Sequence, residues 1–359
     1  MSLDVAGFFA PWAIHALVLV LHVVVPAQRV RGYVRDAGGA PLLYRLNGLP
    51  VLALVVAAWW WLGARGLVPW QWLWTHRWAG LAGAATMGLV FTAAVVAGAP
   101  RIGRAWLVEA YLGRRANPRL LGGRLDLKMF LYQAGATLLA LNLCSFAAQH
   151  IALHAGSASP GVLLHLALFG WFLVDYLFFE RVHLYTYDLF AENVGFKLGW
   201  GCLVFYPYFY ACGLWSVVER GDPGTPTALL VVYALVFFAG WSLSRGANLQ
   251  KFFFKLDPRA RFLGIVPVTV EDDRHALLCS GFWGVSRHVN YLGELLMATG
   301  LALALGWPTA IGPWLYPLYY VVLLVPRERD DHRRCAAKYG ELWARYCARV
   351  RWRIVPGLY

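Results

Sequence analysis

The chain has 359 residues, of which 60% are hydrophobic and 14% are charged. A soluble globular domain has about 25% charged residues, so this composition excludes an ordinary soluble enzyme and indicates an integral membrane protein. The formal net charge is +13. Basic residues beside membrane spans follow from membrane topology, so this charge does not indicate a nucleic-acid-binding protein.

Seven apolar runs are long enough to cross a membrane: 6–26, 49–68, 79–99, 130–153, 160–179, 195–218 and 226–244. Two shorter apolar segments follow at 292–306 and 313–325, and 277–291 is a candidate for a further short helix. The sequence therefore predicts nine or ten spans. The first run has no basic segment before it and no clear cleavage site, so we expect a span rather than a signal peptide.

Basic residues are concentrated in alternate connections. The loops 27–47, 100–128, 180–197 and 245–275 and the tail after Pro326 are basic, whereas 69–78, 154–159 and 219–225 hold few basic residues. With seven spans before residue 245, all the basic loops lie on one side of the membrane. The positive-inside rule then predicts an N-terminus outside and a C-terminus in the cytoplasm.

The six cysteines form no CxxC pair, and several lie in apolar runs. Cysteines in such surroundings usually pack as small apolar side chains. We expect neither a disulfide framework nor a metal site.

The segment 280–295, SGFWGVSRHVNYLGEL, is the densest group of polar and aromatic residues beside the last spans. Gly281 and Gly284 permit tight turns or close approach of a ligand to the backbone. Trp283 and Tyr291 offer flat faces, and Asn290 offers hydrogen bonds. An interfacial aromatic belt is the alternative interpretation.

The tail from Arg327 to Arg353 is rich in arginine, whose planar forks suit phosphates. Helical spacing puts Asp331, Cys335 and Lys338 on one face, and Tyr339 and Tyr346 one heptad apart. A basic juxtamembrane helix bound to anionic lipid head groups is the alternative.

Lys251 and Lys255 are one helical turn apart where the seventh apolar run continues out of the membrane. They are candidates for a clamp on a second phosphate, or ordinary positive-inside anchors. Together with the tail, they indicate a site for a large anionic, aromatic ligand.

The segment 171–195 carries Asp175, Glu180, Asp188 and Glu192 at or near membrane depth. Acidic residues there are functional candidates because a charge near hydrocarbon is costly. Asp175 is the most informative, since it lies inside an apolar run. Around Asp188 and Glu192 an interfacial loop with paired charges is the preferred interpretation.

Ten motifs occur in a fixed order along the chain: RVRGYV (29–34), LYRLNG (43–48), GRRANPR (113–119), LDLKMF (125–130), VDYLFFE (174–180), NVGFKLGWG (193–201), ANLQK (247–251), SGFWGVSRHVNYLGEL (280–295), CAAKYGELWARYC (335–347) and WRIVPGLY (352–359). This set resembles the sterol reductase family, which includes the Δ14- and Δ7-sterol reductases, the fungal C24(28) reductase and the membrane domain of the lamin B receptor. The resemblance covers residues 27–359.

The resemblance implies an all-α polytopic membrane fold of about ten transmembrane helices, with a C-terminal NADPH pocket that faces the cytoplasm. Residues 1–359 would form a single reductase domain, with seven spans in 1–244 and the NADPH-binding part in 245–359. The cofactor-binding positions that it implies are Lys251, Lys255, Leu278, Trp283, Asn290, Tyr291, Arg327, Asp331, Cys335, Ala336, Ala337, Lys338, Tyr339 and Tyr346.

The implied reaction is reduction of a carbon–carbon double bond in a sterol or related polycyclic isoprenoid. An isolated double bond must be protonated before it accepts hydride, so the enzyme needs a buried acid. The candidates for that acid are Tyr176, Glu180 and Asp331, with Asp175 as support. The SGFWGVSRH segment favours the Δ7 over the Δ14 bond, because the Δ14 pattern usually has SGWWG.

Six departures from the family pattern include Ala116 in place of glutamate and Gln133-Ala134-Gly135 in place of an RPG-like turn, and those at Cys202, Glu294 and Pro326 leave the substrate specificity open. Lys255 stands where arginine is usual, Glu294 where aspartate is usual, Pro326 where histidine is common, and Cys202 at an acidic position.

Two other functions remain as alternatives. Isoprenylcysteine-type membrane methyltransferases, which use S-adenosylmethionine, have a similar tail, but this tail has Asp330-Asp331 in place of their paired glutamates. A non-catalytic sterol-binding protein is the second.

We expect membrane lipids and no nucleic acid as partners, and a location in the inner membrane of a bacterium or the endoplasmic reticulum of a eukaryote; the oligomeric state is not predicted.

Overall fold

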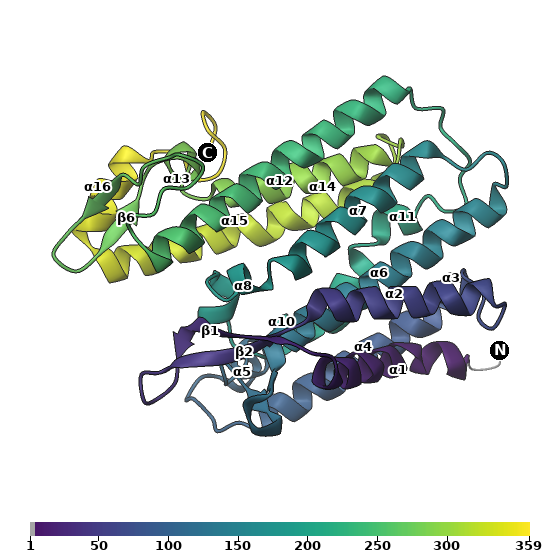
Figure 1. Cartoon of the computed structure of the whole chain (residues 1–359), viewed down its shortest axis with the longest axis horizontal. Helices are drawn as coiled ribbons and strands as arrows, with labels where there is room; N and C mark the ends of the chain where they lie inside the picture. The colour runs from purple at the N-terminus through teal and green to yellow at the C-terminus, as the bar shows by residue number, and fades with distance from the viewer. Residues whose placement is uncertain (1–3) are drawn as a thin grey trace. The chain divides into compact units, whose positions relative to one another are not determined.

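The computed structural model describes residues 4–359, which pack as two compact units. Unit 1 extends to Asp222 and unit 2 is Pro223–Tyr359. Helices dominate both units, as expected for an all-α membrane protein (Figure 1). Three two-stranded antiparallel sheets are an addition that the sequence analysis did not predict.

Unit 1 is built around one long central helix. Its long helices are α1 (Val5–Val24), α2 (Gly48–Ala64), α4 (Arg77–Ala97), α6 (Leu127–Leu153) and α7 (Pro160–Phe178). Its short helices include α3 (Trp72–Thr75), α5 (Trp106–Leu112), α8 (Glu180–His183) and α9 (Tyr187–Phe190). The central helix is α6, which is buried along most of its length and contacts α1, α2 and α7. A helix that is apolar all round is expected to be buried in this way.

Five described helices are long and apolar enough to cross a membrane: α1, α4, α6 and α7 of unit 1 and α12 (Thr227–Leu256) of unit 2. Two shorter apolar helices are α2 and α14 (Val289–Ala304). Each of these seven overlaps an apolar segment that the sequence marked as a span. They support an integral membrane protein.

The apolar run 195–218 is not one regular helix, which corrects the sequence interpretation. It consists of α10 (Phe196–Trp200), a π-helix η2 (Gly201–Phe209) and α11 (Cys212–Trp215). Pro207 lies inside the π-helix, and a proline has no backbone N–H to continue an α-helical ladder. Hydropathy alone does not reveal such a change of helix type, and π-helices are often found at functional sites.

The basic loop 27–47 is mostly a hairpin of β1 (Gln28–Arg35) and β2 (Pro41–Leu46). The Tyr44 ring is buried against Gly32, where an added Cβ would come within 2.5 Å of it. Glycine therefore permits this contact. The second sheet of unit 1 pairs β3 (Arg119–Leu120) with β4 (Leu125–Asp126), immediately before α6, with the short 3-10 helix η1 (Leu121–Gly123) between them.

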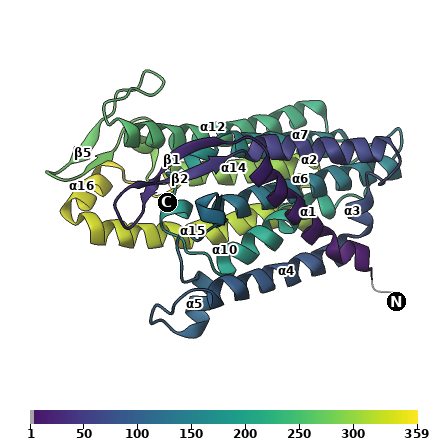
Figure 2. The same cartoon turned by 60° about the horizontal axis from the view of Figure 1, so that its bottom comes forward.

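In unit 2, α12, α14 and α15 (Ile311–Tyr339) lie side by side (Figures 1 and 2). The sheet of β5 (Thr269–Glu271) and β6 (Ala276–Leu278) packs at one end of this unit with α16 (Glu341–Arg349), as Figure 2 shows. The short helix α13 (Phe282–Val285) follows β6. The segment 277–291, a candidate for a further short helix, thus consists of the end of β6, a turn, the four-residue helix α13 and the start of α14. Its chain turns at Gly281, where φ is +61°, a conformation that suits glycine.

Helix α15 is continuous from the last apolar segment into the basic tail. It places Asp331, Cys335 and Lys338 within two turns of one helix, as their spacing predicts. The helix ends at Gly340, where φ is +52°. Tyr339 and Tyr346 consequently lie on two different helices, and the predicted heptad relation between them is wrong.

Candidate functional site

The C-terminal candidate site that the sequence indicates lies in unit 2, where α12 ends. The Lys251 Nζ lies 4.6 Å from the centre of the Trp283 ring. The Trp283 Nε1 donates a hydrogen bond of 2.8 Å to the Ala247 carbonyl on α12. This bond fixes the indole beside the lysine, and an ammonium over an indole face is an attractive pair. Lys255 follows one turn later on the same helix.

Gln250 joins the ANLQK and SGFWG motifs. Its side-chain Nε2 donates to the Ser280 carbonyl (3.2 Å), and its Oε1 accepts from the Phe282 N–H (3.0 Å). A Cβ at Gly281 would come within 2.5 Å of the same amide. The glycine thus permits both its own left-handed turn and the close approach of Gln250. Sequence spacing gave no sign of this contact.

His288 lies between the aromatic and acidic residues of the site. Its ring stacks on Tyr291, with centroids 4.8 Å apart and planes 19° apart. Its Nε2 is 3.9 Å from the Asp331 Oδ2. Burial is the main cause that lowers the His288 pKa to about 3. Nearby positive charges also lower it, and Lys251 contributes most among them. The imidazole is therefore neutral at physiological pH, and its contact with Asp331 is not an ion pair.

The face of α15 beyond Asp331 carries a thiol and a cation. The Cys335 Sγ is 3.9 Å from Asp331 Oδ2, and burial, followed by the Asp331 charge, raises the Cys335 pKa to about 12. This thiol stays protonated and is not a nucleophile. The Lys338 Nζ lies 4.7 Å from the centre of the Tyr339 ring.

The other implied cofactor positions differ in exposure. Leu278 packs with Ala247, Trp283 and Val289 in one apolar cluster. Tyr346 is buried in a second cluster with Cys279, Trp343 and Val350, against which Tyr339 packs. Ala336 and Ala337 are exposed, and Arg327 is half-buried. Within residues 4–359 the buried Oδ1 of Asn290 has no hydrogen-bond partner.

These residues suit a large anion that also carries an aromatic amide. Lys251, Lys255 and Lys338 supply positive charge, the Tyr291 and Trp283 rings supply flat apolar surfaces, and the Asn290 oxygen is a buried acceptor that needs a donor. A buried acceptor without a donor costs free energy, so a ligand amide that donates to it would be favoured.

Glu180, a candidate acid, lies in unit 1 at the start of α8, two residues after the end of α7. Its side chain is 6% exposed, and its Oε2 accepts a hydrogen bond of 2.9 Å from the Gly48 N–H. The LYRLNG and VDYLFFE motifs therefore meet. Burial raises the Glu180 pKa to about 7, although the Gly48 hydrogen bond opposes the shift. The carboxyl is thus about half protonated at neutral pH, as a general acid requires.

A pocket of about 190 Å³ opens beside Glu180. Leu46, Leu49, Pro50, Leu177 and Phe178 form its apolar walls, and Gln28, Asn47, Glu180 and Arg181 line its polar part. The carboxyl therefore borders space that is partly apolar.

Tyr176 lies in an aromatic cluster of unit 1. Its ring centroid is 4.3 Å from that of His183 and 6.4 Å from those of Tyr132 and Tyr206. The His183 Nε2 is also 3.0 Å from the Tyr176 carbonyl. Tyr176 and Glu180 are thus held by different neighbours. Asp331, the third candidate acid, belongs to unit 2.

The other acidic residues of 171–195 have structural partners. Glu192 forms a 2.7 Å ion pair with Lys197, which agrees with the paired-charge interpretation. The backbone carbonyl of Asp188 accepts a 3.0 Å hydrogen bond from the buried Lys128 Nζ. Asp175 is half-buried on α7.

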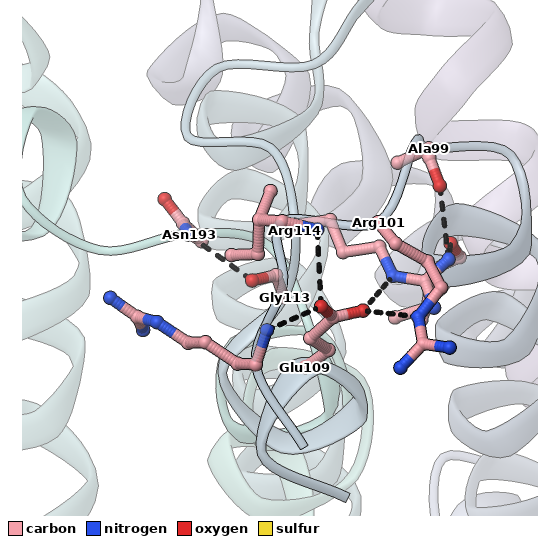
Figure 3. Close-up of polar contacts among 9 residues, drawn as sticks. Ala99, Arg101, Glu109, Gly113, Arg114 and Asn193 are labelled. Atoms are coloured by element: carbon pink, nitrogen blue, oxygen red, sulfur yellow. Dashed lines mark hydrogen bonds and ion pairs between the residues drawn. The ribbon is translucent and has the colours of Figure 1, made fainter. Parts of the chain in front are cut away.

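Glu109, which the sequence analysis did not select, is a buried anchor of unit 1 (Figure 3). Its carboxylate accepts hydrogen bonds from the backbone N–H groups of Ile102 (3.1 Å) and Arg104 (3.0 Å) and from the Arg114 Nε (2.7 Å). Burial alone would raise the Glu109 pKa, but these hydrogen bonds outweigh it and the pKa is lowered. Glu109 therefore stays ionised.

The same cluster joins the GRRANPR and NVGFKLGWG motifs. The Gly113 carbonyl accepts from the Asn193 side chain at 3.1 Å (Figure 3). The Val194 N–H donates to the Arg115 carbonyl at 2.9 Å. Because every Glu109 oxygen has a donor, we interpret this cluster as structural.

The long apolar helices indicate a polytopic integral membrane protein. Its candidate binding residues lie near the ends of these helices. Residues 6–359 match the ergosterol biosynthesis ERG4/ERG24 family, so the chain belongs to this sterol reductase family, as the ordered motifs predicted.

Three examples represent the curated relatives that are named Delta(14)-sterol reductase. The Arabidopsis thaliana protein is 34% identical over 349 residues, which cover 94% of this chain and 91% of the relative. The Methylotuvimicrobium alcaliphilum protein is 32% identical over 369 residues, covering 99% and 83%. The Mus musculus protein is 35% identical over 257 residues, covering 70% and 60%.

Proposed function

We propose that this protein is an NADPH-dependent sterol reductase, which reduces a ring double bond of a sterol or a related polycyclic isoprenoid. The observation that carries the proposal is the grouping of Lys251, Trp283, His288, Tyr291 and Asp331 in unit 2. This grouping combines positive charge with flat rings, and Asn290, next to Tyr291 in the sequence, adds a buried acceptor. A dinucleotide site requires these features. Membership of the sterol reductase family supplies the substrate class.

The Δ14 bond is the first substrate to test. The sequence comparison of SGFWG with SGWWG favoured Δ7, but the relatives reported above are named for the Δ14 reaction and match most of the chain. Because a match over the whole chain carries more information than one motif, we propose Δ14 as the preferred bond and keep Δ7 as the alternative.

NADPH, when bound, supplies hydride, and the protein residues bind and orient it. In this proposal Lys251, Lys255 and Arg327 hold its phosphates, and Asn290 accepts a hydrogen bond from its carboxamide. Tyr291 and Trp283 contact its rings. The positions Leu278, Asp331, Cys335, Ala336, Ala337, Lys338, Tyr339 and Tyr346 complete the site that the family pattern implies.

The proton comes from Tyr176, Glu180 or Asp331. Glu180 has the strongest physical support, because its buried carboxyl has a pKa of about 7 and borders a partly apolar pocket. The proton adds to one carbon of the double bond and hydride adds to the other, which balances the reduction.

We also propose that both units belong to one reductase domain, with the C-terminal tail in the cytoplasm, where soluble NADPH is available.

The test is incubation of the purified full chain in detergent with NADPH and a panel of Δ14, Δ7 and Δ24(28) sterols. We expect NADPH consumption and a product two mass units heavier with the Δ14 sterol. If no sterol is reduced while NADPH still binds, the protein is a cofactor-binding member without this activity. If S-adenosylmethionine rather than NADPH binds, the methyltransferase alternative replaces the proposal.

A further inference from the structure

A buried carboxylate lies on α15 outside the candidate cofactor positions. Glu328 is fully buried. Its two oxygens are 3.0 and 3.4 Å from the Arg353 Nη1, and its Oε2 accepts a 3.2 Å hydrogen bond from the Tyr359 hydroxyl. The Arg353 guanidinium also lies 5.7 Å from the centre of the Tyr359 ring. The Arg353 side chain is 34% exposed, whereas the carboxylate that it faces is buried, so loss of Arg353 would leave a buried charge without compensation.

The chain around Arg353 is a closed turn. The backbone oxygen of Tyr359 accepts hydrogen bonds from the N–H groups of Arg353 (2.9 Å), Ile354 (2.8 Å) and Val355 (3.0 Å). Three consecutive N–H groups that converge on one oxygen hold residues 353–359 in a fixed shape. The Tyr359 phenol is thereby directed at Glu328.

The same segment supports the loop that carries His288. The N–H groups of Arg287 and His288 donate to the carbonyls of Trp352 and Arg353, both at 2.9 Å. The Ser286 hydroxyl donates to the Ile354 carbonyl at 2.9 Å. The Arg353 side chain therefore bonds to Glu328 on α15, while the Arg353 backbone carbonyl accepts a hydrogen bond from His288.

This connection joins two parts of the candidate cofactor site. Asp331 follows Glu328 by three residues on α15, which is about one turn. His288, 3.9 Å from Asp331, is held by the segment to which Glu328 is bonded. A shift of Arg353 would change the position of His288 relative to Asp331.

We propose that Glu328, Arg353 and Tyr359 form a positioning network that fixes His288 and Asp331 for cofactor binding. The network touches neither reacting atoms nor, in this assignment, the cofactor. This inference rests on the proposed function, because NADPH is the ligand that it concerns.

The test compares Glu328→Gln and Tyr359→Phe with a matched control. Glu328→Gln keeps the shape of the side chain and removes its charge. Tyr359→Phe removes only the hydrogen bond from the phenol to Glu328. This milder variant provides the test if Glu328→Gln does not fold. Glu341→Gln is the control, since Glu341 is an exposed residue of the same type at the start of α16. The measurements are the NADPH dissociation constant, the turnover at saturating NADPH and amide hydrogen exchange at residues 287 and 288.

We expect Glu328→Gln to weaken NADPH binding about tenfold, with a smaller effect of Tyr359→Phe, faster exchange at residues 287 and 288, and turnover within about twofold at saturating NADPH. A dissociation constant equal to that of Glu341→Gln in both variants would overturn the proposal, even if they melt at a lower temperature. If wild-type protein binds NADPH but reduces no sterol, the proposed function fails while the comparison of dissociation constants still tests the network.

Discussion

Glu180 shows how local surroundings give one carboxyl among many a chemical role. Its neighbours Asp188 and Glu192 are also acidic and also follow α7, yet Glu192 is paired with Lys197. Glu180 accepts a hydrogen bond from the Gly48 N–H and is buried beside a partly apolar pocket. Burial therefore disfavours the ionised form of Glu180 and raises its pKa to about 7.

We predict that Glu180→Gln lowers turnover by at least about a hundredfold, which is the usual contribution of a positioned general acid. The glutamine keeps an acceptor for the Gly48 N–H and loses the transferable proton. In the wild type, turnover should fall as the pH rises above about 7, where Glu180 loses its proton. Kinetics from pH 5.5 to 9 check this.

The control for this experiment is Glu192→Gln, which removes a nearby paired carboxylate. It should leave the pH profile unchanged. Wild-type turnover by Glu180→Gln would assign the proton donation to Tyr176 or Asp331 instead.

The raised pKa of Glu180 also makes the stability of the fold depend on pH. The folded-state pKa of about 7 lies above the ordinary value of 4.5. Between these values the native state binds more protons than the unfolded state, so its stability falls as the pH rises through this range. Glu180→Gln should flatten this part of the dependence of the unfolding temperature on pH.

At the scale of elements, α12 and α14 depend on glycine for their contact. A Cβ added at Gly293 would lie 2.5 Å from the Gly240 carbonyl oxygen and 2.5 Å from the Ser244 N, both backbone atoms of α12. A Cβ at Gly300 would meet Phe237 at 2.8 Å. Small residues at these positions let the two helices approach closely, as is common in membranes.

We predict that Gly293→Ala destabilises the protein by about 1–3 kcal/mol, because the backbone atoms that it meets cannot move independently. Gly170→Ala on α7 is the matched control, since a Cβ there meets nothing within 4 Å. Thermal unfolding in one detergent compares the two. Equal unfolding temperatures would show that α12 and α14 are not held at this separation.

Continuous hydrophobicity is enough to locate most of the long helices. The runs at 6–26, 79–99, 130–153 and 160–179 end within a few residues of α1, α4, α6 and α7, because a helix must pair its own backbone groups in hydrocarbon. The hairpin at 28–46 and the π-helix η2 were not predicted. The first depends on the contact between Gly32 and Tyr44, and the second on the packing of residues around Pro207, and neither leaves a periodic pattern.

The candidate site was predictable only in part, because many of its contacts join residues that are far apart in the sequence. The motif resemblance selected Lys251, Trp283, Tyr291 and Asp331, which the structure of unit 2 places in contact with one another or with His288. Gln250, Glu328 and Tyr359 act through partners that are 25 or more residues away in sequence. No local spacing rule identifies such partners.

At the scale of the whole molecule, the central claim is that one chain supplies both a hydride-donor site and a proton donor. The family match extends over residues 6–359 and therefore includes both units. The predicted orientation, with the tail in the cytoplasm, agrees with this claim because NADPH is a soluble, cytoplasmic ligand. Labelling of the tail in intact cells before and after permeabilisation would check the orientation.

The most direct test of the central claim follows the two hydrogens into the product. Purified protein is incubated with a Δ14 sterol and NADPH that carries deuterium on the reactive carbon of the nicotinamide, first in ordinary water and then, with unlabelled NADPH, in heavy water. The account predicts one deuterium in the sterol from each experiment, because hydride comes from NADPH and the proton exchanges with solvent. A reduced sterol without deuterium from NADPH, or no reduced sterol at all, would contradict it.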